Sequence, residues 1–524
     1  MSFIHDYFLI TFLIFLCVYF NVDYKYRKFL LLITSYLFYF SLAGKCIFIL
    51  LFTTLIDYYV GLTLYQFQYS HNNDRSKQNK KNLLFLLSLF TNLLMLFIFK
   101  YYNFFVDNFS FLSAKEYLPY SNLILPAGIS FYTFQSLGYI IDIYNEKAEA
   151  EKNFVTYALY ISFFPQLLSG PIEKAQEMIP QLIRKTNFDF DFFMDGLLRF
   201  SFGLFKKLVI ADRVAIVVNI VYKNPDNYSW AMLVVATFLY SIQIYCDFSG
   251  YCDMAIGISK MLGIKLTENF QIPYFSSSIK EFWKRWHITL GRWFRVYVYI
   301  PIGGNRNTDG SPSIFRGLFN IWVVFFLCGL WHGANWTFVV WGMLHAFYYS
   351  IETILGVVKE KIANSINANT NLGILRSIYN SKYFTLSSST IYKFSSIFIL
   401  QIKIAITFIL VNIAWIFFRA NNLSDAVFIF NKIFFSNHSS IEIKNELIIP
   451  LQNMFASSLD LPIIMIVLPI SILITYILIK IKEIKSNFNS CAWVPLKSSI
   501  FYIIILSIMI FKVSKYAEFI YFQF

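Results

Sequence analysis

Three of the six histidines lie in apolar or interfacial sequence and are the side chains best suited to chemistry. His332 lies in the run GLWHGANW, between glycines and tryptophans. Glycine allows close backbone approach, and an indole supplies a rigid, mostly apolar wall. Partial desolvation there keeps an imidazole neutral at pH 7, so His332 is predicted to act as a general base. Solvation accounts for the other three histidines, which lie near the N-terminus or in polar loops: His5, His71 and His438.

His345 follows His332 by thirteen residues. At about 100° per residue, the two would lie on widely separated faces of a single helix. They form no HExxH-type pair, and no third ligand follows at a useful spacing, so no catalytic metal is expected. His345 is therefore interpreted as structural rather than catalytic.

The stretch FWKRWHITLGRWFRVYVYIPIGGNR, residues 282–306, mixes aromatic side chains with Arg285, Trp286, His287 and further basic residues. One interpretation is an interfacial helix with tryptophans at the level of the lipid headgroups. A functional alternative is a surface that holds the phosphates of a coenzyme. Both remain open at this point.

Asp247 and Asp253 lie with Ser249 in QIYCDFSGYCDMAIG, an otherwise apolar stretch. Carboxylates in apolar surroundings need partners, and arginines or backbone donors are expected. A structural ion-pair role is favoured over direct catalysis.

The elements that position these side chains are predicted to be membrane helices. Of 524 residues, 57% are hydrophobic and only 14% are charged, against roughly a quarter charged in soluble proteins. The net charge of +14 lies mostly in the breaks between apolar runs. Anionic headgroups and the positive-inside bias explain that distribution, and nucleic acid is not an expected partner.

Apolar runs predict about a dozen crossings of a hydrocarbon core about 30 Å thick. The expected spans are residues 3–20, 29–42, 47–64, 83–99, 154–168, 194–222, 231–245, 314–329, 336–355, 397–418, 462–480 and 499–512. The first run lacks a basic leader and a small-residue cleavage site, so a retained span is expected. Basic breaks at 23–28 and 70–82 place those loops in the cytoplasm and the N-terminus outside the cell.

The chain is expected to form one integral membrane domain over residues 1–524, with core motifs over about 125–430 and C-terminal spans over 462–515. Proline and glycine interrupt apolar sequence around residues 126–171, and such irregular backbone survives at membrane depth only beside protein or a water-filled cavity. Polar surface loops are predicted at 359–396 and 437–453.

Six blocks in order closely resemble the membrane-bound O-acyltransferase superfamily, in its bacterial branch of alginate and peptidoglycan O-acetyltransferase membrane subunits. The blocks are GISFYTFQSLGYIID (128–142), FFPQLLSGPIEK (163–174), QIYCDFSGYCDMAIG (243–257), the 282–306 stretch, GLWHGANW (329–336) and NIAWIFFRANN (412–422). The resemblance implies an all-α polytopic fold, with re-entrant or interfacial helices and tilted helices around a central tunnel.

The resemblance also implies a site and a reaction. His332 falls on the family's catalytic histidine and His287 on a second polar position. Acetyl-coenzyme A, or another acyl thioester, is the expected donor from the cytoplasm, with no bound cofactor and no metal. The candidates for contact with substrate or tunnel are Trp331, Asn335, Trp336, Trp286, Arg285, Asp247, Ser249 and Asp253.

The acceptor implied is an envelope polysaccharide such as peptidoglycan or alginate, reached through a separate extracytoplasmic SGNH-type acetyltransferase. The expected location is the bacterial inner membrane, in contact with its lipids. Three alternatives remain: D-alanyl or other acyl transfer to teichoic acid, a multi-pass transporter, and a scaffold without catalysis.

Overall fold

The computed structural model describes residues 3–4, 6–68, 75–109, 120–307, 309–368, 390–436, 446–447, 449–454, 490–512 and 519–520. Over these residues the protein is built from helices and contains no β-strand, only an isolated bridge between Arg306 and Pro312. Two compact units are formed, one from Met1–Glu268 with Ser436–Phe524 and the other from Asn269–Phe435.

Six helical segments of the described chain are long and apolar enough to cross a membrane. They are Tyr24–Gln68, Arg75–Asn108, Trp230–Met261, Ile314–His332, Trp336–Asn364 and Ser396–Arg419, with two shorter apolar helices at Tyr7–Asn21 and Ser498–Phe511. The predicted all-α polytopic membrane fold is confirmed. The span expected at 462–480 lies outside the described residues.

The first unit holds most of the helices. They are α1 Asp6–Asn21, α2 Tyr24–Ala43, α3 Ile47–Gln68, α4 Arg75–Leu96, α5 Tyr102–Phe109, α7 Ile129–Tyr144, α8 Phe154–Ser162, α9 Ala175–Ile183, α10 Phe190–Phe205, α11 Asp212–Lys223, α12 Trp230–Met261, α20 Ile449–Met454 and α22 Ser490–Phe511. A π-helical segment, Lys206–Ala211, joins α10 to α11.

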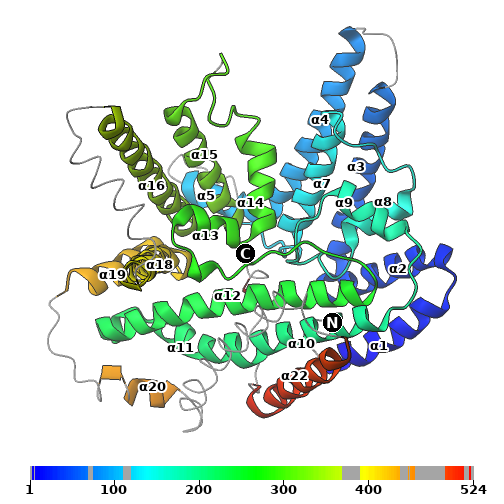
Figure 1. The fold of residues 1–524 in the computed structure, drawn as a ribbon. Helices are drawn as coiled ribbons and strands as arrows, with labels where there is room; N and C mark the ends of the chain where they lie inside the picture. The colour runs from blue at the N-terminus through cyan, green and yellow to red at the C-terminus, as the bar shows by residue number, and fades with distance from the viewer. Residues whose placement is uncertain are drawn as a thin grey trace. The chain divides into compact units, whose positions relative to one another are not determined.

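Helices α10 and α12 pack antiparallel along one another (Figure 1). Two glycine pairs allow this approach, Gly196 against Gly257 and Gly203 against Gly250. A Cβ atom on Gly203 would lie 2.5 Å from the Gly250 carbonyl oxygen, so neither backbone could stay in place. Small residues at helix contacts are how membrane helices gain packing energy without a hydrophobic driving force.

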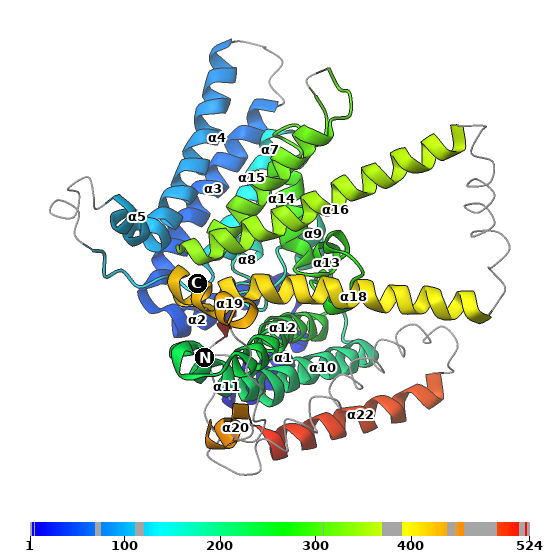
Figure 2. The ribbon, with the colours of Figure 1, turned by 90° about the vertical axis from the view of Figure 1, so that its left-hand side faces the viewer.

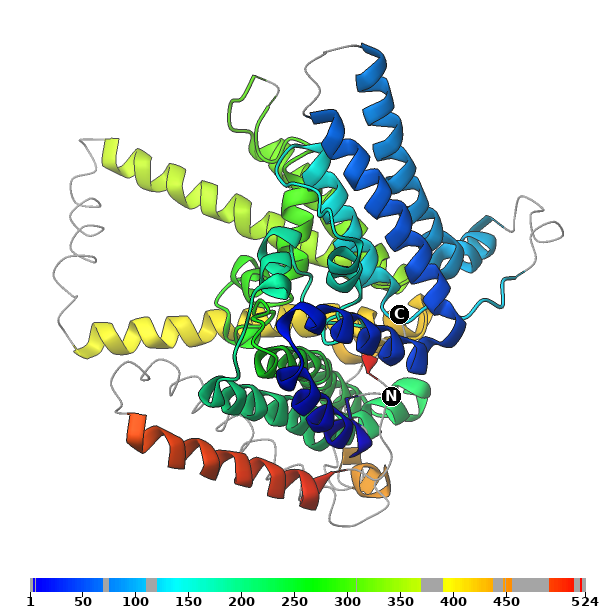
Figure 3. The ribbon, with the colours of Figure 1, turned by 90° about the vertical axis from the view of Figure 1, so that its right-hand side faces the viewer.

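Helices α3 and α4 lie side by side and both pack on α7 (Figure 2, Figure 3). Their contact buries Asp57 completely, and its carboxylate accepts hydrogen bonds from the Ser88 hydroxyl and the Asn92 amide. Helix α2 ends before α3 begins because Gly44 adopts a positive φ of 52°, which glycine reaches without steric cost.

The second unit contains the helices α13 Ile279–Arg285, α14 Ile288–Phe294, α15 Ile314–His332, α16 Trp336–Ala368, α18 Thr390–Arg419 and α19 Leu423–Phe434. Helices α15 and α16 pack through Gly329 and Gly342, whose Cβ positions would lie 2.5 and 2.2 Å from carbonyl oxygens of the facing helix. Helices α16 and α18 pack together and diverge toward Ala368 at the end of α16 and Thr390 at the start of α18 (Figure 2).

Several predicted boundaries were wrong. The span expected at 231–245 continues as α12 through Asp247 and Asp253 to Met261, because partners within the same unit neutralise both carboxylates. The span expected at 154–168 is only the nine-residue α8, since Phe163 is not helical and the residue before Pro165 disfavours helix.

The residue ranges predicted for the two polar loops also include helical residues. Helix α16 extends to Ala368 and α18 begins at Thr390, so both helices enter the loop expected at 359–396. Helix α20 lies inside and just beyond the loop expected at 437–453. At the end of α16, Lys359, Glu360 and Lys361 are exposed on the helix, and a hydropathy pattern does not separate such a helix end from a loop.

Candidate functional site

His332 is the last residue of α15, and its side chain is only 2% exposed. Helix α15 ends there because Gly333 is extended. A Cβ atom on Gly333 would lie 2.2 Å from the Phe338 ring, so only glycine fits this turn. The turn reverses the chain into α16 and leaves the imidazole inside the second unit.

Three aromatic rings surround the His332 imidazole edge-on. The ring centroids of Trp331, Trp341 and Phe418 lie 4.9, 4.9 and 5.1 Å away, at interplanar angles of 76°, 87° and 73°. Aromatic walls desolvate the imidazole and restrict its rotation. A desolvated, oriented imidazole suits proton transfer.

His287 precedes α14 with a positive φ of 43°, a conformation that is uncommon for residues other than glycine and that gathers at functional sites. Its Nδ1 lies 3.2 Å from the Asn269 side-chain oxygen. The Thr289 backbone N–H and hydroxyl also donate to that oxygen, at 3.1 and 3.0 Å. Since the shared atom accepts a backbone N–H, it is an oxygen, so His287 Nδ1 must carry a proton.

The His287 side chain is 1% exposed, and burial lowers its pKa from 6.5 to about 3. The imidazole is therefore neutral and offers a lone pair at Nε2. Its ring lies 6.0 Å from Trp331, which also contacts His332. A neutral His287 carries no positive charge with which to bind a phosphate.

His345 is completely buried in α16, and the single-helix geometry considered from its spacing does not apply. His332 and His345 lie on different helices and contact the same indole, Trp341, at 4.9 and 5.1 Å. The indole N–H of Trp283 donates to His345 Nδ1 at 3.2 Å. The spacing in the sequence did not predict this shared contact, because the turn at Gly333 separates α15 from α16 and brings the two helices together.

The rings around His332 and His345, including Trp331, Trp341 and Phe418, form an aromatic cluster. The other expected residues of the second unit lie partly beside this cluster and partly elsewhere. Trp331 is buried beside His332, and Trp286 stacks on Phe282 and contacts Trp415. The remaining three have other surroundings: Trp336 is 48% exposed, Arg285 pairs with Glu281, and Asn335 binds the Asn421 carbonyl and the Thr337 N–H.

Asp247 and Asp253 belong to the first unit, where each has a buried cationic partner. Lys207 bridges Asp247 and Asp212 at 2.6 and 2.9 Å. The second oxygen of Asp247 accepts the Ile520 backbone N–H at 2.7 Å.

Asp253 binds Arg199 at 2.6 Å and Lys206 at 2.7 Å. Lys206 also donates to the Ser249 hydroxyl at 3.2 Å, and Arg199 also binds Glu268 at 2.6 Å. The structure thus places all three expected residues of this block in an ion-pair network. Lys206 and Lys207 were overlooked in the sequence, although two adjacent lysines inside the apolar run 194–222 were a usable signal.

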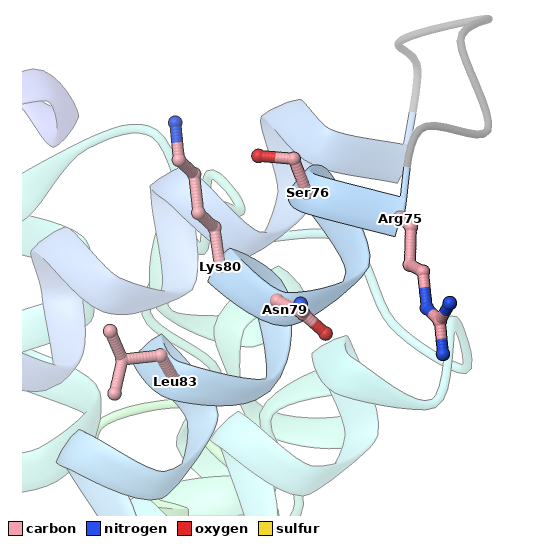
Figure 4. A pocket seen from close by; sticks show the side chains of 5 residues that line it. All are labelled: Arg75, Ser76, Asn79, Lys80 and Leu83. Atoms are coloured by element: carbon pink, nitrogen blue, oxygen red, sulfur yellow. The ribbon is translucent and has the colours of Figure 1, made fainter.

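An open hollow lies at the start of α4, lined by Arg75, Ser76, Asn79, Lys80 and Leu83 (Figure 4). It is basic and lies on the surface, and no histidine lines it. Among the described residues, no group of three His, Cys, Asp or Glu side chains could hold a metal ion.

Residues 31–365 match the membrane-bound O-acyltransferase family, a range that contains all three buried histidines. The chain is 36% identical over 443 residues to the probable alginate O-acetylase AlgI of Pseudomonas putida, covering 83% of this chain and 80% of the relative. It is 34% identical over 428 residues to the peptidoglycan O-acetyltransferase of Helicobacter pylori, covering 77% and 72%.

A weaker similarity, 29% over 234 residues, links it to the teichoic acid D-alanyltransferase of Bacillus subtilis, covering 44% of this chain and 59% of the relative. The apolar helices, the block series and these similarities agree with one another. The chain belongs to the membrane-bound O-acyltransferase family and is a multi-pass membrane O-acyltransferase.

Proposed function

We propose that this protein moves an acetyl group from a cytoplasmic thioester, acetyl-coenzyme A, toward O-acetylation of an envelope polysaccharide such as peptidoglycan or alginate. The observation that carries the proposal is His332, held at a helix end by three aromatic rings inside the region matched by the family. The alginate O-acetylase of Pseudomonas putida and the peptidoglycan O-acetyltransferase of Helicobacter pylori match 83% and 77% of the chain, against 44% for the D-alanyltransferase of Bacillus subtilis.

In the proposed reaction, an acceptor hydroxyl attacks the thioester carbonyl. His332 takes the hydroxyl proton as the new C–O bond forms, the C–S bond breaks, and the proton passes to the departing thiolate. The products are an ester and a free thiol, and no external oxidant or reductant is needed. His287 helps to orient the donor or the acceptor.

The surroundings we propose are the bacterial inner membrane, with the N-terminus outside the cell. Apolar side chains such as Phe398, Ile399 and Ile406 on α18 are exposed and suit contact with lipid tails. An extracytoplasmic SGNH-type acetyltransferase is the proposed partner that completes transfer to the polymer.

The test compares base-releasable acetate on purified envelope polysaccharide between wild-type cells and cells carrying His332→Ala at equal membrane abundance. We expect the ester to fall to background in the variant. Release of D-alanine in place of acetate would assign the protein to teichoic acid D-alanylation. Full acetylation in the variant would overturn the catalytic role of His332 and favour a transporter or scaffold.

A further inference from the structure

Two neighbouring buried N–H donors, of which the first belongs to a ring that contacts His332, meet no acceptor in the described part of the chain. They are the indole Nε1 of Trp341 and the Nε2 of His345. Both side chains are fully buried. A buried donor without an acceptor carries the full penalty of desolvation, so a neighbouring pair in a packed region indicates an acceptor that the described residues do not supply.

The hydrogen bond from Trp283 fixes which nitrogen of His345 carries the proton. An indole N–H is a donor only, so His345 Nδ1 must accept it through a lone pair. The neutral ring then carries its proton at Nε2. His345 is a donor toward its surroundings, the opposite of His287, whose Nδ1 proton is held by Asn269.

The His345 ring is held rigidly. Phe282 and Phe325 lie nearly parallel to it, at interplanar angles of 3° and 19° and centroid distances of 6.0 and 6.1 Å. The Trp341 ring contacts His345 at 5.1 Å and His332 at 4.9 Å. Donors with fixed orientation stabilise developing charge without reorganising during the reaction.

We propose that the His345 Nε2–H and the Trp341 Nε1–H bind the carbonyl oxygen of the acyl group that reacts at His332. When the hydroxyl oxygen attacks, the carbonyl π electrons move onto that oxygen, and the two N–H groups stabilise its negative charge. The electron pair on that oxygen then re-forms the carbonyl π bond as the C–S bond breaks. The thiolate leaves as a thiol with the proton that His332 held. This inference rests on the proposed acyl transfer, and it makes His345 part of the catalytic machinery.

The test uses substitutions of similar size at His345 and measures the initial rate of acetate ester formation on the polysaccharide after induced expression. His345→Leu removes the donor, and His345→Gln restores an N–H at the place of Nε2. We expect His345→Leu to lower the rate by about 100-fold, as loss of one oxyanion donor does in other enzymes, and His345→Gln to stay within about tenfold of wild type. Trp341→Phe should also lower the rate by at least about tenfold.

The matched control is Trp322→Phe, which removes another indole N–H from the same helix pair, in this case a bond to the Ser350 hydroxyl. It should leave the rate unchanged. Membrane abundance and the melting temperature in detergent are measured for every variant, so that unfolding is seen separately from loss of rate.

Equal losses in His345→Leu and His345→Gln, or a rate within twofold of wild type in His345→Leu, would overturn the inference. The second outcome would indicate an ordered water as the acceptor of these two N–H groups. His332→Ala is run in parallel: if it keeps full ester, the proposed function fails. If it loses the ester while His345→Leu does not, only the further inference fails.

Discussion

The network of α10–α12 and the aromatic cluster of α15, α16 and α18 bury polar groups in different ways. In the network, lysine and arginine cations lie against carboxylates at 2.6–2.9 Å. In the cluster, histidines lie against aromatic rings, and two N–H groups face no acceptor of the described chain. Ion pairs formed within the network stabilise the fold. The N–H groups of Trp341 and His345 are instead those proposed above to bind the substrate.

The largest effect on stability is expected from Lys207→Met. It leaves the buried Asp212 and Asp247 without their shared cation, and breaking a buried ion pair costs about 3–5 kcal/mol. The loss in the free energy of unfolding is measured by unfolding the purified protein with increasing fractions of a denaturing detergent. Unchanged stability would mean that this network does not hold the first unit together, and the contrast with the cluster would fail.

Acid should destabilise the second unit through His287. Its folded-state pKa of about 3 lies below the ordinary 6.5, so the stability from the neutral form is complete above pH 6.5 and is lost as pH falls toward 3. Between pH 6.5 and 4.5 the loss is about 2–3 kcal/mol. Melting temperatures of wild type and His287→Gln across this range check the prediction, and parallel curves for the two proteins would contradict it.

Gly203→Ala tests whether the close approach of α10 and α12 supports the network. The new Cβ atom would lie 2.5 Å from the Gly250 carbonyl, and overpacking of this kind costs about 1–3 kcal/mol. Gly356→Ala on α16 is the control, because no atom lies within 4 Å of its Cβ position. We expect only Gly203→Ala to unfold at a lower fraction of denaturing detergent than wild type. Wild-type stability of Gly203→Ala would refute the packing argument.

The smallest effect is expected from Arg285→Gln. Its ion pair with Glu281 is partly exposed, and such pairs contribute about 0–1 kcal/mol. Ester formation should stay within about twofold of wild type at equal abundance. A large loss of rate with normal stability would return Arg285 to the substrate site and extend the site beyond the aromatic cluster.

The aromatic cluster shows which contacts can be predicted from neighbouring residues in the sequence and which cannot. The GLWHGANW run and its apolar flanks singled out His332, because glycine, tryptophan and imidazole are informative as neighbours in the chain. The interpretation of His345 as structural rested on its spacing from His332 and on the lack of a third metal ligand. Its hydrogen bond joins residues 62 positions apart, and periodicity does not report such contacts.

The sequence alone determined the membrane fold and the family, and it predicted the histidine most suited to chemistry. Apolar length, composition and an ordered series of blocks are properties of the chain before it folds. Only the tertiary structure decided that Lys207 pairs with Asp247 across 40 positions, that α12 continues through two carboxylates, and that His287 and His345 carry their protons on opposite nitrogens. The physical reason is that pairing, burial and tautomer depend on which groups meet in space.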